Sequence, residues 1–128
     1  MLRALLGVPL LFLIVSLAAC RTWARVEDNL AWTLVVPEKV HYGADLVFTV
    51  QARTANGEPA DGVSFLWAVD WVNAEGARRG SGVRHKGRAF EPQDIRVKRS
   101  TGEALLRIYA YDSAGNVHQV AQKEFQVE

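Results

Sequence analysis

The clearest pattern along the chain is an alternation of apolar and polar positions over residues 63–72. Successive side chains of a β-strand point to opposite faces, so this period of two predicts a strand with one buried face. The expected inner face consists of Val63, Phe65, Trp67, Val69 and Trp71, and the expected outer face of Ser64, Leu66, Ala68 and Asp70.

Six further segments have the same period or a β-rich composition, and clusters of Gly, Pro, Asn and Asp separate them. The predicted strands are 30–36, 46–54, 83–90, 94–99, 104–112 and 117–127. In 46–54 the expected core face is Leu46, Phe48, Val50 and Ala52; in 104–112, Leu106, Ile108 and Ala110 oppose Arg107, Tyr109 and Tyr111. Residues 73–82 have the composition of a long loop, and 113–116 of a tight turn with Gly115 and Asn116 suited to positive φ. Seven strands with short connections and no convincing helix predict an all-β sandwich or barrel.

The first 19 residues have a different pattern. Arg3 precedes a nearly all-apolar stretch from Leu5 to Val15, which only Gly7 and Pro9 interrupt. A membrane-spanning helix needs about 20 apolar residues, so a signal peptide is favoured over a permanent transmembrane helix.

The stretch Leu17-Ala18-Ala19-Cys20 resembles the lipobox of bacterial lipoprotein precursors, which is Leu, small, small, Cys, and all four positions match. The resemblance covers about the first 20 residues. It implies that a lipoprotein signal peptidase cuts before Cys20, that the Cys20 thiol carries a diacylglyceryl group, and that the new amino group can be acylated. Two or three acyl chains anchor stably, because each buried CH₂ contributes about 0.8 kcal/mol. The alternative is an ordinary secretory signal followed by an incidental cysteine.

This resemblance also implies a location in the cell envelope. In a Gram-negative host, Arg21 rather than Asp after the lipidated cysteine favours the outer membrane, facing the periplasm. The expected domains are a cleaved signal peptide at 1–19, a lipid anchor and short tether at 20–29, and a β-sandwich at 30–128. The tether, 21–29, can extend over about 30 Å, which predicts a domain close to the bilayer.

Two segments of the β-rich part carry a second resemblance. The stretch "NGEPADGVSFLWAV" is similar to the B–C region of bacterial immunoglobulin-like domains, and "LRIYAYDSAGNV" to their F–G hairpin. The likeness runs from about Pro37 to Glu128 and implies a single immunoglobulin-like antiparallel sandwich of about seven strands. Trp67 is then the expected tryptophan at the sandwich centre. Fold alone implies no activity, because such sandwiches host many unrelated functions.

Charge adds one candidate binding region to this picture. The net charge of the whole chain is only +1, which points to no nucleic-acid partner. Between residues 78 and 99, however, eight basic residues stand against two acidic ones, a net charge of +6. The basic residues are Arg78, Arg79, Arg84, Lys86, Arg88, Arg96, Lys98 and Arg99. They could meet anionic lipid, envelope polymer or an acidic protein, or could form a solvated edge that discourages strand-to-strand aggregation.

The outer face of 104–112 supplies the second candidate. Tyr109 and Tyr111 should point away from the core, and an immunoglobulin-like strand order would place Leu66 beside them. Such a face can stack on sugars or dock a protein. The alternative is ordinary cross-strand pairing, or cover by the N-terminal segment that carries Trp23 and Trp32.

Candidate chemistry is sparse. Cys20 is the only cysteine, which excludes an internal disulfide and a multi-cysteine zinc site. The three histidines lack metal-ligand spacing, the serines lack a nucleophile motif, and Asp112 with Asn116 fits a turn better than a calcium site. No catalytic residue, metal or cofactor is expected beyond the lipid on Cys20.

These observations predict a non-catalytic, lipid-anchored envelope domain that docks onto a protein partner in a larger membrane or secretion assembly. Its candidate contact residues are Leu66, Arg78, Arg79, Arg84, Lys86, Arg88, Tyr109 and Tyr111. The alternative is a module that binds anionic envelope polymer or glycan, such as lipopolysaccharide or cell wall. An enzyme or enzyme inhibitor is a third, weaker hypothesis.

Overall fold

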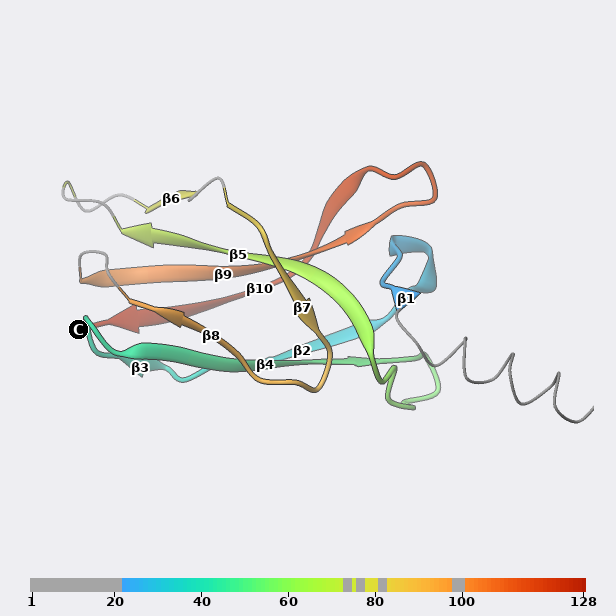
Figure 1. The fold of residues 1–128 in the computed structure, drawn as a ribbon, viewed down its shortest axis with the longest axis horizontal. Helices are drawn as coiled ribbons and strands as arrows, with labels where there is room; N and C mark the ends of the chain where they lie inside the picture. The colour runs from blue at the N-terminus through green and yellow to red at the C-terminus, as the bar shows by residue number, and fades with distance from the viewer. Residues whose placement is uncertain (1–21, 73–74, 76–77, 81–82, 98–100) are drawn as a thin grey trace, which may run out of the picture.

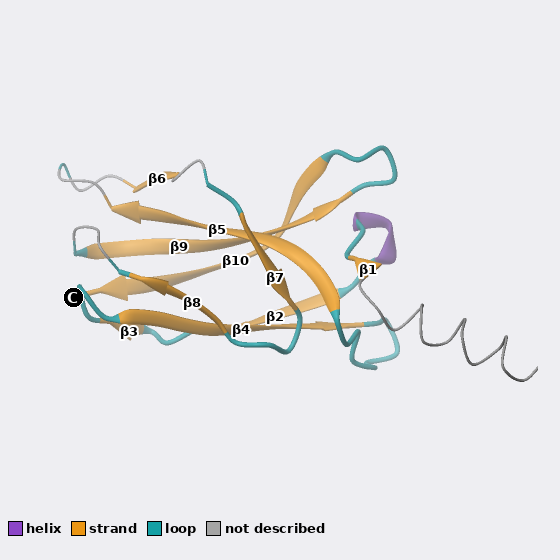
Figure 2. Ribbon diagram, in the orientation of Figure 1, coloured by secondary structure: helices purple, strands orange, loops and turns teal. Residues whose placement is uncertain are grey.

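The described part of the chain forms ten strands and one short 3₁₀ helix (Figures 1 and 2). The computed structural model describes residues 22–72, 75, 78–80, 83–97 and 101–128. In chain order the elements are β1 (Thr22–Trp23), η1 (Val26–Asp28), β2 (Ala31–Val35), β3 (Lys39–Val40), β4 (Asp45–Arg53), β5 (Val63–Val72), β6 (Arg78–Gly80), β7 (His85–Arg88), β8 (Gln93–Arg96), β9 (Gly102–Tyr111) and β10 (Val117–Val127). The predicted signal peptide and the predicted lipidation site, Cys20, lie outside the described residues.

The strands form two sheets. The large sheet has the order β1-β5-β9-β10-β3, and β6 and β7 also pair with β5. The small sheet has the order β2-β4-β8. All the long pairs are antiparallel, whereas the short pairs β1–β5 and β3–β10 are parallel. In Figure 1, β1 and the β9–β10 hairpin lie at one end of the molecule and the C-terminus at the other.

The core lies between the two sheets and follows the predicted alternation. The expected inner faces of 46–52, 63–71 and 106–110 are all buried. Trp67, which is 3% exposed, packs edge-on against Phe48 of the small sheet, with ring centroids 4.9 Å apart. On its other side Trp67 stacks on His85 at 4.4 Å. The expectation of a tryptophan at the centre of a two-sheet core is therefore confirmed.

The seven predicted strands are present, and three short ones are added. Strand β5 matches its predicted bounds, and the predicted adjacency of 63–72 and 104–112 is confirmed, since Leu66 pairs with Tyr109. Strands β1, β3 and β6 were not predicted, because two or three residues are too few to show an alternation. The prediction of an all-β sandwich is confirmed; the structure adds these three short strands, and two of them, β1 and β3, pair in parallel.

Residues 22–29 also differ from the expected tether. Thr22 and Trp23 pair with Val63 and Ser64, and Ala24 is fully buried. The backbone N–H of Ala24 donates to the carbonyl oxygen of Ser64 at 2.8 Å, and its carbonyl oxygen accepts from the N–H of Tyr111 at 3.2 Å. These hydrogen bonds fix the segment against β5 and β9, so it belongs to the sandwich from Thr22 onward. Within the described part of the chain, no helix has the length and apolar character to cross a bilayer.

Candidate functional site

The outer face of the large sheet brings together most of the candidate contact residues. Leu66 on β5 pairs with Tyr109 on β9 and, on its other side, with Lys86 on β7. Residues paired directly across neighbouring strands share a face. Arg84 lies just before β7, and its guanidinium lies over the Tyr109 ring, so it belongs to the same group of side chains.

The side chains of this row are held by aromatic contacts. The Arg84 guanidinium carbon is 4.8 Å from the Tyr109 ring centroid, and Lys86 Nζ is 5.2 Å from that of Trp23. The Trp23 ring meets Tyr111 edge-on, with centroids 5.3 Å apart. Cation–π contacts at exposed sites contribute about 0.5–1 kcal/mol each, so they orient the cations and leave them charged. We name the set Trp23, Leu66, Arg84, Lys86, Tyr109 and Tyr111 the aromatic–cationic face.

Trp23 is the member of this face that sequence reasoning placed in a tether. The only sequence pattern that indicates this strand is Trp23-Ala24-Arg25, in which a small residue separates two large ones. Ala24 is buried between β5 and β9, and that places the Trp23 ring beside Tyr111 on the outer surface. The other tryptophan considered as cover, Trp32, packs inward against Phe65 instead.

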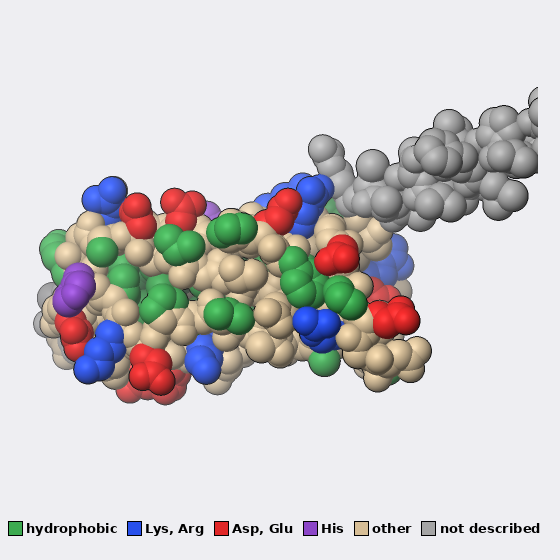
Figure 3. All heavy atoms as spheres, turned by 90° about the horizontal axis from the view of Figure 1, so that it is seen from below, with side chains coloured by type: hydrophobic (Ala, Val, Ile, Leu, Met, Phe, Trp, Pro, Cys, Tyr) green, Lys and Arg blue, Asp and Glu red, His purple; other side chains and the backbone are tan. Residues whose placement is uncertain are grey.

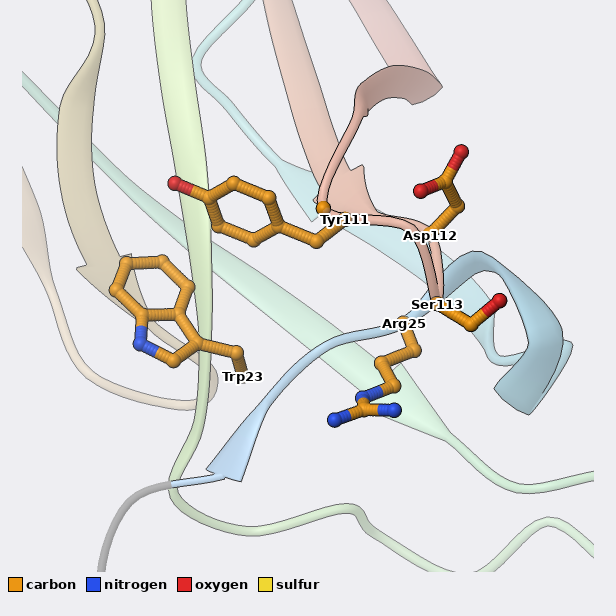
Figure 4. Close-up of a pocket in the computed structure, with 6 residues that line it drawn as sticks. Trp23, Arg25, Tyr111, Asp112 and Ser113 are labelled. Carbon is orange, nitrogen blue, oxygen red and sulfur yellow. The ribbon is translucent and has the colours of Figure 1, made fainter.

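A shallow, open pocket of about 380 Å³ adjoins this face (Figure 4). Trp23 and Arg25 line it from the N-terminal segment, and Tyr111, Asp112, Ser113 and Gly115 from the β9–β10 hairpin. In Figure 4 the Trp23 and Tyr111 rings lie on one side of the pocket, whereas the carboxylate of Asp112 and the hydroxyl of Ser113 point away from them. An aromatic wall beside one guanidinium suits a flat or anionic group better than a cation.

The basic stretch is divided between the two sheets. Arg84, Lys86 and Arg88 belong to the β7 region of the large sheet, whereas Arg96 on β8 binds the carboxylate of Asp45 at 2.9 Å in the small sheet. Arg88 lies 3.7 Å from Glu91. Arg78 and Arg79 belong to β6, but their side chains are outside the described residues, as are Lys98 and Arg99 entirely. The described basic residues therefore do not form one contiguous patch.

Beyond the aromatic end, the outer face carries a polar network. Arg107 Nε donates to the carboxylate of Asp70 at 2.6 Å, and its Nη1 donates to the side-chain oxygen of Gln119 at 2.6 Å. Asp70 is only 8% exposed, and Ser64 and Ala68 on the same face are buried as well. The outer face of β5 is thus more buried than its polar residues suggested: Arg107 on β9 binds the Asp70 carboxylate, and Trp23 on β1 pairs with Ser64.

The hairpin turn is held by Asp112. Its carboxylate accepts hydrogen bonds from His118 at 2.7 Å and from the backbone N–H groups of Ala114 and Asn116. The His118 hydrogen bond first, and the Asn116 backbone bond next, lower the pKa of Asp112 from its ordinary value of 3.8. Gly115 has the expected positive φ of 86°, whereas Asn116 does not. The carboxylate oxygens of Asp112 are therefore used in hydrogen bonds that stabilise the turn.

Catalytic chemistry has little support in the arrangement. Over the described ranges, no group of three or more His, Cys, Asp or Glu side chains is placed to hold a metal ion. His85 stacks on Trp67 in the core and His118 binds Asp112, so each has a structural partner.

The side of the molecule seen in Figure 3 mixes acidic, basic and small apolar areas. What the aromatic–cationic face can do is bind, by stacking and by charge.

The described residues form a small two-sheet β-sandwich with aromatic and cationic side chains on one outer face. No protein-family model matches the chain, and no curated protein matches it either. Among solved structures, the chain is similar to an alkylpurine DNA glycosylase, AlkC, from Pseudomonas fluorescens bound to DNA containing an abasic site analogue. The identity is 16%, the TM-score 0.40, and the match covers 78% of this chain and 30% of the other. The chain thus spans less than a third of the glycosylase.

A second similar structure is a cohesin module of a family 33 glycoside hydrolase from Clostridium perfringens. The identity is 15%, the TM-score 0.40, and the match covers 77% of this chain and 96% of the module. At this level of similarity, neither structure bears on the fold or the activity of the chain.

Proposed function

We propose that the protein is a non-catalytic, lipid-anchored interaction domain of the bacterial cell envelope, and that it docks onto a protein partner through the aromatic–cationic face. The observation that carries the proposal is the presence of two cations and three aromatic rings on one outer sheet face, where Arg84 lies over Tyr109 and Trp23 contacts both Lys86 and Tyr111. Aromatic residues and arginine are the side chains that most often dominate binding energy at protein interfaces.

We infer an immunoglobulin-like sandwich from the strand order. Strands β2-β4-β8 and β5-β9-β10 have the neighbour relations of the A-B-E and C-F-G strands of that fold. Neither sheet needs a disulfide here, because aromatic packing around Trp67 fills the core.

The membrane attachment rests on the lipobox and on the position of the first strand. Only Arg21 separates Cys20 from β1, so a lipid on Cys20 would hold the sandwich directly at the bilayer surface. The covalent lipid would be the only non-protein group, and the outer membrane facing the periplasm is the expected location in a Gram-negative host.

The available charge of the face supports binding of an acidic surface. In the part of the chain that the structure describes, neither Arg84 nor Lys86 forms an ion pair with a carboxylate. Both cations are exposed and rest on rings, which leaves their charge free for a partner. The same observation favours a second candidate, an anionic envelope polymer or glycan, which charge and ring stacking would also bind.

The test is chemical crosslinking of membranes, followed by recovery of the tagged full chain. Arg84→Ala and Tyr109→Ala should each reduce partner recovery by about tenfold, the loss expected for one dominant interface side chain. Thr33→Ala, at an exposed position on β2 in the other sheet, is the matched control. Recovery of the monomer alone from wild-type membranes would refute a protein partner; salt-sensitive binding of purified wall polymer or lipopolysaccharide would then favour the second candidate.

A further inference from the structure

We propose that the end of the aromatic–cationic face nearest the N-terminus lies in the headgroup layer of an anionic phospholipid bilayer. The residues concerned are Trp23, Lys86 and Tyr111 of this face, together with Arg25 of the adjoining pocket. This inference rests on the proposed lipid anchoring, and it adds a second, non-covalent membrane contact that fixes the orientation of the domain. The Arg84–Tyr109 end lies farther from the point of attachment along the same face and is left for the protein partner.

The first argument is distance. Trp23 is three residues after Cys20, and three residues extend over about 10 Å. The headgroup region on each side of a bilayer is about 5–8 Å thick, the difference between the full bilayer and its hydrocarbon core. Because the two lengths are comparable, a lipid attached at Cys20 brings the Trp23 ring within reach of the headgroups.

The second argument is the rigidity of the attachment. The described chain enters the fold at β1, and Ala24 is fixed by hydrogen bonds to both β5 and β9. Trp23 is further held by the Tyr111 edge and by Lys86. Because the point of entry does not swing freely, anchoring at Cys20 sets which part of the sandwich lies closest to the bilayer.

The third argument is the chemistry at that end. Tryptophan and tyrosine gather at membrane interfaces because their rings are apolar and their N–H and O–H groups are polar. Lysine and arginine bind lipid phosphates, and each near an anionic surface contributes to membrane attraction. Trp23, Tyr111, Lys86 and Arg25 combine both properties around one open pocket, and Figure 4 shows the Arg25 guanidinium on the Trp23 side of it.

A protein partner fits this end less well than headgroups do. The pocket is shallow and open, whereas dominant protein contacts gather in pockets that close and exclude water. The lipid anchor holds this end of the domain against the bilayer, so a partner protein would have to fit between the domain and the membrane.

The experiment uses the purified full chain in vesicles of phosphatidylglycerol and phosphatidylethanolamine, attached through Cys20. If mass spectrometry finds the thiol unmodified, the same thiol is coupled to a maleimide-bearing lipid, so that attachment does not depend on cellular lipidation. The readout is the difference in fluorescence between wild type and Trp23→Phe, which isolates the Trp23 signal from those of Trp32, Trp67 and Trp71. Quenching is measured with nitroxide lipids labelled at the headgroup or deep in the acyl chain.

We expect the headgroup quencher to reduce the Trp23 signal about twofold more than the deep quencher, since an interfacial ring lies at headgroup level. Lys86→Glu, or replacement of phosphatidylglycerol by phosphatidylcholine, should remove at least half of that quenching. Lys39→Glu makes the same charge change at an exposed lysine on β3, paired with Glu128 at 3.4 Å, and should leave quenching unchanged.

Two results would overturn the inference. One is a Trp23 signal that neither quencher reduces in attached protein, and the other is equal quenching in Lys86→Glu and Lys39→Glu. A photoreactive residue at Tyr111 that captures protein and no lipid would reject headgroups in favour of a protein partner. An unmodified Cys20 in cells would refute the anchor of the proposed function, while quenching of the chemically attached chain would still decide this inference.

Discussion

Gly87→Ala is the substitution for which the structure and general residue preferences predict opposite signs. Glycine inside a strand normally costs about 0.5–1 kcal/mol relative to alanine, so the exchange should stabilise an ordinary β-strand. A Cβ at Gly87, however, would lie 2.8 Å from Cε2 and Cζ of Phe65 and 3.0 Å from Cδ1 of Trp67. Ordinary carbon contacts are about 3.5–4.0 Å, so the methyl group has no room.

Neither the Phe65 ring nor the Trp67 ring can move away easily from the added methyl group. Phe65 is 1% exposed and is blocked by the Trp32 edge, and Trp67 is enclosed between Phe48 and His85. Overpacking of a filled core costs about 1–3 kcal/mol. After subtraction of the gain from removing glycine, we expect Gly87→Ala to lower the free energy of unfolding by about 1 kcal/mol, and by at most about 2.5 kcal/mol.

The assay is urea denaturation followed by tryptophan fluorescence, with Lys86→Ala as a control on the same strand with an outward side chain. The double variant Gly87→Ala/Phe65→Leu should be more stable than the sum of the two single effects, because removing the ring edge relieves the clash. An unchanged or increased stability of Gly87→Ala would refute the close packing of β7 on the two rings.

Three further predictions concern stability. Trp67→Ala should lower the free energy of unfolding by about 3–5 kcal/mol, measured by chemical denaturation. Trp67→Phe should lower it by less in the same assay, because the buried Nε1 of Trp67 has no hydrogen-bond partner to lose. Arg107→Ala should lower the free energy of unfolding by about 1–3 kcal/mol, because it leaves the carboxylate of Asp70 buried and unpaired. The double variant Asp70→Asn/Arg107→Ala should recover part of that loss in the same assay. The lowered pKa of Asp112 means that its contribution is present above its ordinary value of 3.8 and is lost as the pH falls through the folded-state pKa. The stability difference between wild type and Asp112→Asn should therefore shrink in acid, and a difference that grows there would contradict the His118 contact.

The long strands could be predicted because each buries one face. Phe65, Trp67 and Val69 alternate with smaller or polar residues, and a register shift of one residue would expose all of them. The pairing of Leu66 with Tyr109 then followed from the expected strand order, and it placed both residues on one outer face.

The role of the N-terminal segment could not be predicted from its own residues. Thr22 and Trp23 form a strand only because β5 and β9 leave backbone groups for Ala24 to bind, which is a property of the assembled sheet. For the same reason the local sequence did not show that Trp23 would meet Tyr111 and Lys86. The division of the basic stretch also required the fold, because β7 and β8 join different sheets.

The central claim, that this sandwich is held at a membrane through Cys20, is tested most directly by intact-mass and peptide mass spectrometry of the protein extracted from its native membranes. We expect a mature chain that begins at Cys20 and carries a diacylglyceryl thioether, with or without a further acyl group on the amino nitrogen. A mature chain that begins at another residue, or an unmodified Cys20 thiol, would contradict it.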